Sequence, residues 1–370
     1  MTEKGKLFKD WFDRDAATSL AKQVASAYPD FDQKTFVRRA TRGLSELEFH
    51  ARVKHFSEGL AVGLPPAPEA LEILVHSLPD PLPNCEAVTD GWLLWPVGHF
   101  IGEYGLDYYA KSMRVMTELT MRFSAEFPVR YFIERYPERT MQDLLKLTSH
   151  PNPHVRRWCS EGCRPRLPWG QQLRDLIEDP TPIWPILEAL KDDPELYVRR
   201  SVANNLNDIA KDHPEQVVRR CRVWMKGASL ERAWVVRHGL RSLIKQGNPA
   251  ALQLLGYGKP DRISGILKIQ PDSIWIGESL ELKAVLKNAG KCKQSLMIDY
   301  AVYYVRQGGK TSAKVFKWKT LELAVGQRVE LTKKHPMRQT SVRALYPGQH
   351  TVELQINGER LGCGEFRLKV

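Results

Sequence analysis

The chain has 370 residues, enough for two or three domains that each bury a core. Its 42% hydrophobic and 26% charged residues are ordinary for a globular protein, and no apolar run approaches the roughly 20 residues that a membrane span needs. The formal net charge of +12 favours an anionic partner, with nucleic acid the leading candidate.

The chain begins with MTEKGKLFKDWFD, a charged segment without the apolar core of a secretion signal, so we expect no such signal. Its six cysteines show no disulfide-framework spacing. Unpaired cysteines of this kind are typical of reduced thiols, so we expect a cytoplasmic protein that does not enter a membrane.

Up to about Tyr257 the hydrophobic pattern is helical. Segments 15–28, 34–60 and 105–127 each place apolar residues at i, i+3, i+4 and i+7. Asp-Pro pairs at 80–81, 179–180 and 193–194 suit helix starts and the turns between helices. We therefore predict a helical region over residues 1–258.

After Gly256 the pattern changes to strands. Residues alternate with period two between turn signals such as PDS, NAG, QGGK and YPGQ, at the spacing of a β-sandwich. We predict a linker at 259–264 and an immunoglobulin-like, all-β domain at 265–370. This domain holds 18 Lys and Arg against 9 Asp and Glu, an excess of 9, whereas the residues before it carry an excess of only 3.

The helical region contains a repeat. HPNPHVRRWCSEGC (150–163) matches DPELYVRRSVANNL (193–206) at a shift of 43 residues, and a weaker copy, VVRHGLRSL (235–243), follows 37 residues later. Spacing near 40 with paired helices is typical of HEAT-like α-solenoids, whose units stack because none can bury its apolar face alone. The predicted architecture is thus a multidomain one, a HEAT-like α-solenoid followed by a β-sandwich.

Two cysteines in the first repeat copy raise the question of a metal or redox site. In register, Cys159 falls on Val202 and Cys163 on Leu206, which are core positions of the repeat helix. A metal site needs about four suitably spaced ligands, and the nearest histidines precede the helix. We therefore interpret both cysteines as small apolar core residues and expect no metal.

The other face of the repeat helices carries charge. Arg157 and Glu161 share an exposed stripe at i and i+4, and in the next copies Arg200 and Asp208, then Arg237 and Arg241, occupy the same stripe. A column of arginines with two acids between them suits phosphate oxygens. The alternative is a ladder of ion pairs between repeats, each of little energetic value.

Three segments resemble a known family. FSAEFPVRYFI (123–133), the block from His150 to Trp169 and DPELYVRRSVANNLNDIAKDHP (193–214) are similar to the AlkC branch of the AlkC/AlkD DNA alkylation-repair glycosylases. The likeness covers about residues 1–258, and some members of that branch carry an added immunoglobulin-like domain. The resemblance implies a monofunctional glycosylase that releases cationic bases such as 3-methyladenine and 3-methylcytosine from double-stranded DNA, without holding the base in a pocket and without a cofactor.

The resemblance also implies roles for individual residues. By motif position, Glu161, Asp208 and Glu126 match acids beside the lesion, and Trp169 matches an aromatic that packs on the sugar-phosphate backbone. Candidate DNA contacts or supports for the acids are the arginines of the repeat: Arg157, Arg164, Arg200, Arg237 and Arg241.

These residue types fit the chemistry. Alkylation already weakens the glycosidic bond, so carboxylates have only to stabilise the oxocarbenium on the sugar and orient a water. The bland alternative is that Asp208, late in its helix, and Glu126, just before Pro128, are solvated helix-end residues. No lysine is singled out for Schiff-base chemistry, so we expect no lyase activity.

Lysines of the β-domain are candidate DNA contacts as well. They lie in two expected loops, Lys291 and Lys293 in one and Lys333 and Lys334 in the other. Alternatively, they protect exposed sheet edges from pairing. We expect a monomer. Two functions compete with the glycosylase: a catalytically inert DNA-binding scaffold, and a protein–protein adaptor.

Overall fold

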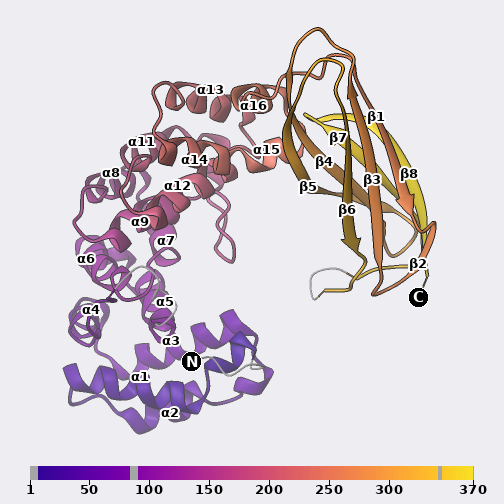
Figure 1. The fold of residues 1–370 in the computed structure, drawn as a ribbon. Coiled ribbons are helices and arrows are strands. Elements are labelled where there is room, and N and C mark those ends of the chain that lie inside the picture. The colour runs from indigo at the N-terminus through magenta and orange to yellow at the C-terminus, as the bar shows by residue number, and fades with distance from the viewer. Residues whose placement is uncertain (1–6, 84–90, 341–343, 370) are drawn as a thin grey trace. The chain divides into compact units, whose positions relative to one another are not determined.

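The computed structural model describes residues 7–83, 91–340 and 344–369 (Figure 1). The predicted fold class is confirmed, with helices up to Leu254 and strands from Ile263 onward. The α-helices are α1 (Arg14–Ala27), α2 (Gln33–Ala40), α3 (Phe49–Gly63), α4 (Ala67–His76), α5 (Trp95–Tyr104), α6 (Tyr109–Thr120), α7 (Pro128–Arg135), α8 (Pro137–Leu147), α9 (Pro153–Gly162), α10 (Arg174–Glu178), α11 (Trp184–Leu190), α12 (Leu196–Ile209), α13 (Pro214–Trp224), α14 (Leu230–Gly239), α15 (Arg241–Lys245) and α16 (Pro249–Leu254). Short 3-10 turns are η1 (Phe8–Trp11), η2 (Leu44–Glu46), η4 (Trp92–Leu94), η5 (Leu106–Tyr108) and η6 (Thr181–Ile183).

Helix starts follow from local sequence. The side chains of Asp13, Asp32 and Asn152 accept a backbone N–H in the first turn of α1, α2 and α9. Several helices, α7, α8 and α9 among them, begin with proline, whose missing N–H costs nothing in the first turn. Segment 34–60, predicted as helical throughout, is divided between α2 and α3, and Gly43 adopts the left-handed conformation (φ 70°) in the connection.

The three repeat copies lie on helices that stack on one another. The shared valines Val155, Val198 and Val235 belong to α9, α12 and α14, and all three are fully buried. Helix α12 packs against α9 on one side and α14 on the other. The repeat predicted from the sequence is therefore the packing unit of the helical region.

The C-terminal strands form two sheets. Strands are β1 (Ile263–Gln270), β2 (Ser273–Trp275), β3 (Ser279–Asn288), β4 (Gln294–Val305), β5 (Thr311–Leu323), β6 (Arg328–Pro336), β7 (Gly348–Ile356) and β8 (Glu359–Lys369). One sheet has the order β1-β3-β6 and the other β2-β8-β7-β4-β5. Alternate residues point inward, as along β3, and together build one apolar core that includes Leu282, Val302 and Phe366.

The expected linker is tied to the sandwich. Strand β1 begins inside it at Ile263, and Asp261 exchanges two hydrogen bonds with Gln294, of 2.8 and 2.7 Å. Asn357, in the turn between β7 and β8, donates to the carbonyl of Gly258 at 2.8 Å. Residues 259–264 are therefore a bonded part of the sandwich rather than a free tether.

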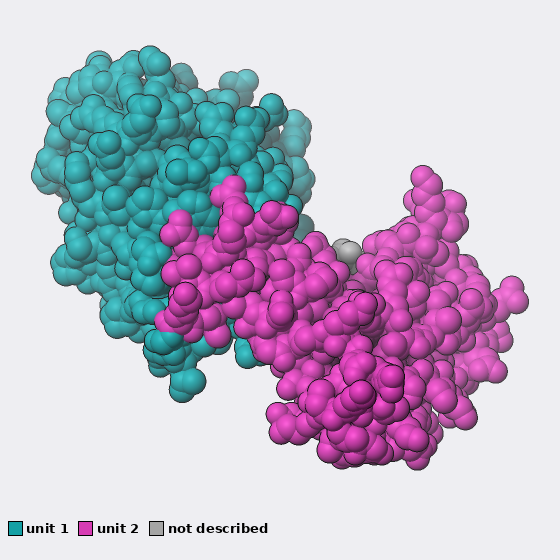
Figure 2. Space-filling model, turned by 90° about the horizontal axis from the view of Figure 1, so that it is seen from above, with its two compact units in different colours: residues 1–213, 227–239 teal, residues 214–226, 240–370 magenta. Residues whose placement is uncertain are grey.

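Packing divides the chain into two compact units (Figure 2). Unit 1 comprises residues 1–213 and 227–239, and unit 2 comprises 214–226 and 240–370. Unit 2 thus takes α13, α15 and α16 together with the strands. The domain limits predicted from the sequence, 1–258 and 265–370, stay a prediction.

Within the described ranges, none of the helices combines the length and the apolar character needed to traverse a lipid bilayer.

Candidate active site

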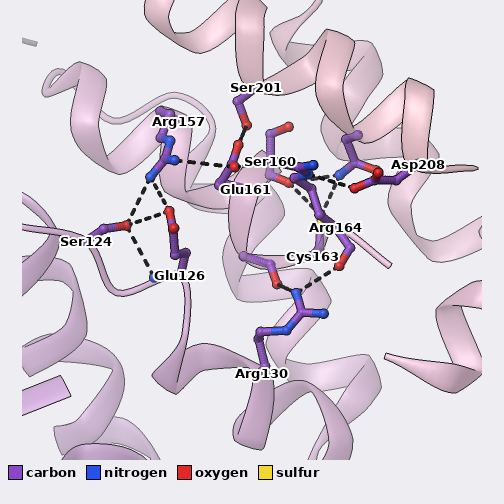
Figure 3. Close-up of polar contacts among 12 residues, drawn as sticks. Ser124, Glu126, Arg130, Arg157, Ser160, Glu161, Cys163, Arg164, Ser201 and Asp208 are labelled. Atoms are coloured by element: carbon purple, nitrogen blue, oxygen red, sulfur yellow. Dashed lines mark hydrogen bonds and ion pairs between the residues drawn. The ribbon is translucent and has the colours of Figure 1, made fainter. Parts of the chain in front are cut away.

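Three acids of unit 1 are joined by arginines into one chain of ion pairs. Glu126 precedes α7, Glu161 lies in the last turn of α9, and Asp208 lies late in α12. Two arginines, Arg157 and Arg164, stand between them, and Figure 3 shows the alternation of acid and base. The acids that the sequence singled out on separate elements are therefore brought together.

The expectation of an exposed stripe was wrong for its two acids, although Arg200 and Arg237 on the same stripe are exposed. The side chain of Glu161 is 7% exposed and that of Asp208 is 2% exposed. The two acids are covered because α12 packs directly on α9, and Arg164 beyond the helix end folds back over both of them. Asp208 is accordingly a buried residue and not a solvated helix end.

Glu161 is the centre of the chain. Its Oε1 accepts from Arg164 Nη1 at 2.6 Å and lies 3.4 Å from Arg157 Nη2, and its Oε2 accepts from Ser201 Oγ at 2.6 Å. Burial acts to raise the pKa of Glu161, but Arg157 and Arg164 outweigh it and lower the pKa. Glu161 is therefore an ionised carboxylate that is held in place by three donors.

Asp208 and Glu126 form the two ends. Asp208 accepts from Arg164 Nε and from Lys211 Nζ, each at 2.8 Å. Glu126 pairs with Arg157 and accepts from Ser124 Oγ at 2.9 Å. With a side chain that is 14% exposed, Glu126 is the most accessible of the three acids.

The two arginines serve different parts of the chain. Burial acts against the charged form of Arg157, yet the carboxylates of Glu126 and Glu161 prevail and raise its pKa. Its guanidinium also lies 5.4 Å from the ring centre of Tyr197. Arg164, which we expected to contact DNA, is 7% exposed and engaged with Glu161 and Asp208.

Trp169 lies on the connection after α9, where its ring is exposed. The residue is 65% exposed, and its backbone has a φ of 65°, a left-handed conformation that costs a bulky residue energy. The ring lies near those of Phe8, Phe49 and Trp95, with centroids 6.1, 5.8 and 6.5 Å away. Strain of this kind persists only where the surrounding structure holds it.

Arg130, which the sequence reasoning missed, holds this connection. From α7 it donates to the carbonyls of Gly162 at 2.9 Å and Arg164 at 2.8 Å (Figure 3). It also donates to the carbonyl of Gln171 at 2.8 Å. Burial lowers the pKa of Arg130 to about 10, so the side chain stays charged at neutral pH. In the sequence, its segment FPVRYFI looks like an apolar helix start, and the only signal of such a role is an arginine among apolar residues. The structure shows that this arginine is fully buried.

The remaining candidate arginines differ in their exposure. Arg200 on α12 and Arg237 on α14 are exposed, whereas Arg241 is half-buried on α15 and belongs to unit 2. The pairing of Arg157 and Arg164 follows the ion-pair alternative, and Arg200 and Arg237 keep the exposure that a phosphate contact needs.

Both cysteines of the repeat lie in the core, as predicted. Cys159 and Cys163 are fully buried, and each thiol donates to the carbonyl four residues earlier, at 3.2 Å. Burial raises the pKa of Cys163 to about 12. Across the part of the chain that the structure describes, no three His, Cys, Asp or Glu side chains converge to hold a metal ion.

The four candidate lysines of the sandwich are not all in loops. Lys291 and Lys293 do lie between β3 and β4, and Lys293 pairs with Glu322 at 2.8 Å. Lys333 and Lys334 lie within β6, opposite Leu282 and Glu281 of β3. The expected second loop was wrong because β6 continues its ladder with β3 to Pro336, which places the two lysines on opposite faces of the sheet.

This fold and site define a class: helical-repeat proteins with a buried acid–arginine chain and a C-terminal immunoglobulin-like sandwich. Residues 264–370 match the family described as the C-terminal Ig-like domain of uncharacterised protein YhaZ. Uncharacterized protein YhaZ of Bacillus subtilis (strain 168) is 35% identical over 363 residues, which cover 97% of this chain and 99% of that protein.

A solved structure extends the likeness to the whole fold. The alkylpurine DNA glycosylase AlkC of Pseudomonas fluorescens, bound to DNA containing an abasic site analog, superimposes with a TM-score of 0.90. It is 36% identical, and the match covers 99% of this chain and 100% of that one. The chain belongs to the AlkC branch of the AlkC/AlkD family, as the sequence motifs indicated.

Proposed function

We propose that the protein is a monofunctional DNA glycosylase that hydrolyses the N-glycosidic bond of cationic N-alkylated bases, 3-methyladenine and 3-methylcytosine, in double-stranded DNA. The observation that carries the proposal is the full-length similarity to an alkylpurine DNA glycosylase, at 36% identity. The chain of ion pairs that brings three acids together supports it.

The reaction we propose needs little from a general acid. The alkylated base carries a positive charge and leaves with the bonding electrons, so the barrier comes from the oxocarbenium that develops on the deoxyribose. Carboxylates held at that sugar stabilise the cation and orient the water that captures it. We place Glu126, the most accessible acid, nearest the sugar. The buried carboxylates of Glu161 and Asp208 add to the negative electrostatic potential at that position.

Arg157 connects substrate binding to this acid. In the structure its guanidinium is shared between Glu126 and Glu161. A DNA phosphate that draws Arg157 toward itself would release Glu126 toward the sugar, because arginine pairs at least as well with phosphate as with carboxylate. In this proposal Arg157, Arg200 and Arg237 hold phosphates, and the exposed ring of Trp169 packs on the sugar-phosphate backbone.

The proposal also covers DNA contacts of the sandwich, the oligomeric state and the location of the protein in the cell. Its excess of 9 positive charges, with Lys291 and Lys293 in an exposed loop, supports a salt-sensitive contact with the DNA backbone. We propose that the protein acts as a monomer in the cytoplasm, on the nucleoid, without a cofactor and without lyase activity.

An inert DNA-binding scaffold is the second candidate. The observation that favours it is that each of the three acids is already paired with an arginine, as in a purely structural ladder.

Release of free base from methylated duplex DNA separates the two candidates. The purified protein is incubated with duplex DNA treated with a methylating agent, and released bases are quantified by chromatography with mass detection. A glycosylase frees 3-methyladenine and 3-methylcytosine and leaves intact strands with abasic sites. A scaffold binds the same DNA and frees no base.

A further inference from the structure

A cavity of about 330 Å³ lies beside Trp169 in unit 1. This volume is at the lower end of the range for small-molecule sites, so it suits one heterocycle better than a nucleotide. Six of its thirteen lining residues carry aromatic or imidazole rings: His50, Trp95, His99, Phe127, Tyr131 and Trp169.

The rings offer flat apolar faces. Trp95 and Phe127 stack with centroids 4.8 Å apart and planes 22° apart, and the plane of Trp169 lies 24° from that of Trp95. Because Trp169 is 65% exposed, most of its ring is open to a ligand. Flat heterocycles, and nucleobases in particular, stack on such faces whatever their sequence context.

The polar groups of the wall suit a neutral ligand with hydrogen-bonding edges. Burial lowers the pKa of both His50 and His99, so both rings are neutral at pH 7. Among the described residues the buried Nδ1 of His99 has no hydrogen-bond partner. A buried polar atom of this kind is satisfied by a ligand or water that offers a matching edge.

The wall also contains cations and lacks acids. Lys54 and Arg130 line the cavity, and none of its lining residues is Asp or Glu. Lys54 is paired at 3.8 Å with Glu58, which is not among the lining residues, so Arg130 is the cation that the wall leaves without a carboxylate. Its charge disfavours a cationic ligand. The lesion in DNA is cationic, so this cavity and the acid chain are suited to different species.

Hydrolysis of the glycosidic bond converts the cationic base in DNA into a neutral free base. When the C1′–N bond breaks, its electron pair goes to the base nitrogen and cancels the positive charge; water supplies the hydroxyl on C1′ and its other proton passes to solvent. The released base is neutral and planar. Phe127, the residue after Glu126, lines the cavity, so the two sites adjoin along the chain.

We infer that this aromatic cavity is a binding site for the released, neutral nucleobase. The inference rests on the proposed function for the source of the base. In this inference His99 forms a hydrogen bond with the edge of the base, and the rings of Trp95 and Trp169 stack on its faces.

Binding of free 3-methyladenine to the full-length protein, without DNA, tests the site. Quenching of tryptophan fluorescence reports binding, since two of the ten tryptophans, Trp95 and Trp169, line the cavity. Deoxyribose 5-phosphate, which has no aromatic face, is the negative ligand. Ala51 lines the cavity from an exposed position on α3, so Ala51→Phe fills the cavity without removing a core contact. Ala110, exposed on α6 and outside the cavity, gives the matched control Ala110→Phe.

We expect wild type and Ala110→Phe to bind the base equally and Ala51→Phe to bind about tenfold more weakly, because the added ring occupies the cavity and keeps the base from a stacking face, an effect of about this size. The inference is overturned if the wild type shows no saturable quenching up to about 1 mM base, a millimolar affinity limit. It is also overturned if Ala51→Phe binds the base as tightly as the wild type. Base release from methylated DNA is measured in parallel, with and without added 3-methyladenine. Release without product binding or inhibition defeats this inference alone, and binding without release defeats only the proposed function.

Discussion

At the scale of the residue, burial decides what the charged side chains can do. Glu161 is fixed by two guanidiniums and a hydroxyl, which leaves it ionised and immobile rather than ready to exchange a proton. Trp169 is the opposite case: an exposed ring on a strained backbone. Both are arrangements that preorganise a site instead of maximising stability.

The strain at Trp169 leads to a paired prediction. Glycine adopts a φ of 65° freely and alanine does not, so Trp169→Gly should unfold with a free energy about 1 kcal/mol higher than Trp169→Ala. Both variants lack the ring and should lose base release alike. Urea denaturation compares the two stabilities, and a less stable glycine variant would show that the left-handed backbone is not strained.

Sequence reasoning reached some of these residues and missed others. Spacing predicted that Arg157 and Glu161 share a stripe, and the repeat register predicted that Cys159 and Cys163 are core residues; the structure confirms both. Burial of the acids could not be predicted, because Arg164 reaches Asp208 across 44 residues of sequence. Long-range contacts of one side chain leave no local pattern.

At the scale of the element, the acid chain fastens α9 to α12. Arg164 bridges Glu161 of α9 and Asp208 of α12, and Ser201 of α12 donates to Glu161. The repeat helices are thus joined by apolar packing and by buried charge together. Removing one arginine leaves its acid partners buried with one opposite charge fewer.

Arg164 and Arg166 are a matched pair for testing this. Arg164→Met should lower the free energy of unfolding by about 3–5 kcal/mol, because two buried acids each lose one of their two cationic partners. Arg166 pairs with Asp212 at 2.8 Å near the surface, so Arg166→Met should lower it by less than about 1 kcal/mol. Equal losses in urea denaturation would mean that the buried chain contributes no more than a surface ion pair.

Asp299 on β4 gives a pH-dependent prediction. Burial raises its pKa to about 6 against the pull of Lys317, so its carboxyl binds a proton more tightly in the folded than in the unfolded protein. Its contribution to stability therefore falls as the pH rises from about 4 to about 6 and is constant above. Asp299→Asn should unfold with a free energy roughly 1–3 kcal/mol higher than wild type at pH 8 and little different near pH 4. A difference independent of pH would contradict the raised pKa.

The same limit on sequence reasoning holds for elements. Hydrophobic period and turn residues predicted helices and strands well, since both depend on neighbours in sequence. They misplaced Lys333 and Lys334 in a loop because β6 is stabilised by its ladder with β3, some 50 residues away. The break at Gly43 within segment 34–60 needed the observed backbone angle to be recognised.

At the scale of the whole molecule, charge is distributed unevenly between the helices and the sandwich. The excess of 9 positive charges in residues 265–370 has no matching acidic surface within that segment, which holds only 9 acids. Such an excess adds a sequence-independent, salt-sensitive component to DNA binding.

Salt dependence of DNA affinity tests the part played by the exposed loop between β3 and β4. Each phosphate contact contributes about 0.9 to the slope of log K against log salt concentration, so Lys291→Gln with Lys293→Gln should flatten the slope by up to about 2. Lys22 and Lys34, exposed in the first helices, provide a control of equal charge change. An unchanged slope for the Lys291/Lys293 variant, or an equal change in the control, would remove the loop from the interface.

The most direct test of the account is the single-turnover rate of 3-methyladenine release from methylated duplex DNA. Glu126→Gln preserves shape and hydrogen bonding but removes the charge, and Glu138→Gln makes the same change at an exposed position on α8. We predict that Glu126→Gln slows release by about 10²–10³-fold, the cost of losing one preorganised electrostatic partner, while Glu138→Gln keeps the wild-type rate. Equal rates for wild type and Glu126→Gln, with equal DNA affinity, would contradict the proposal that this acid stabilises the transition state.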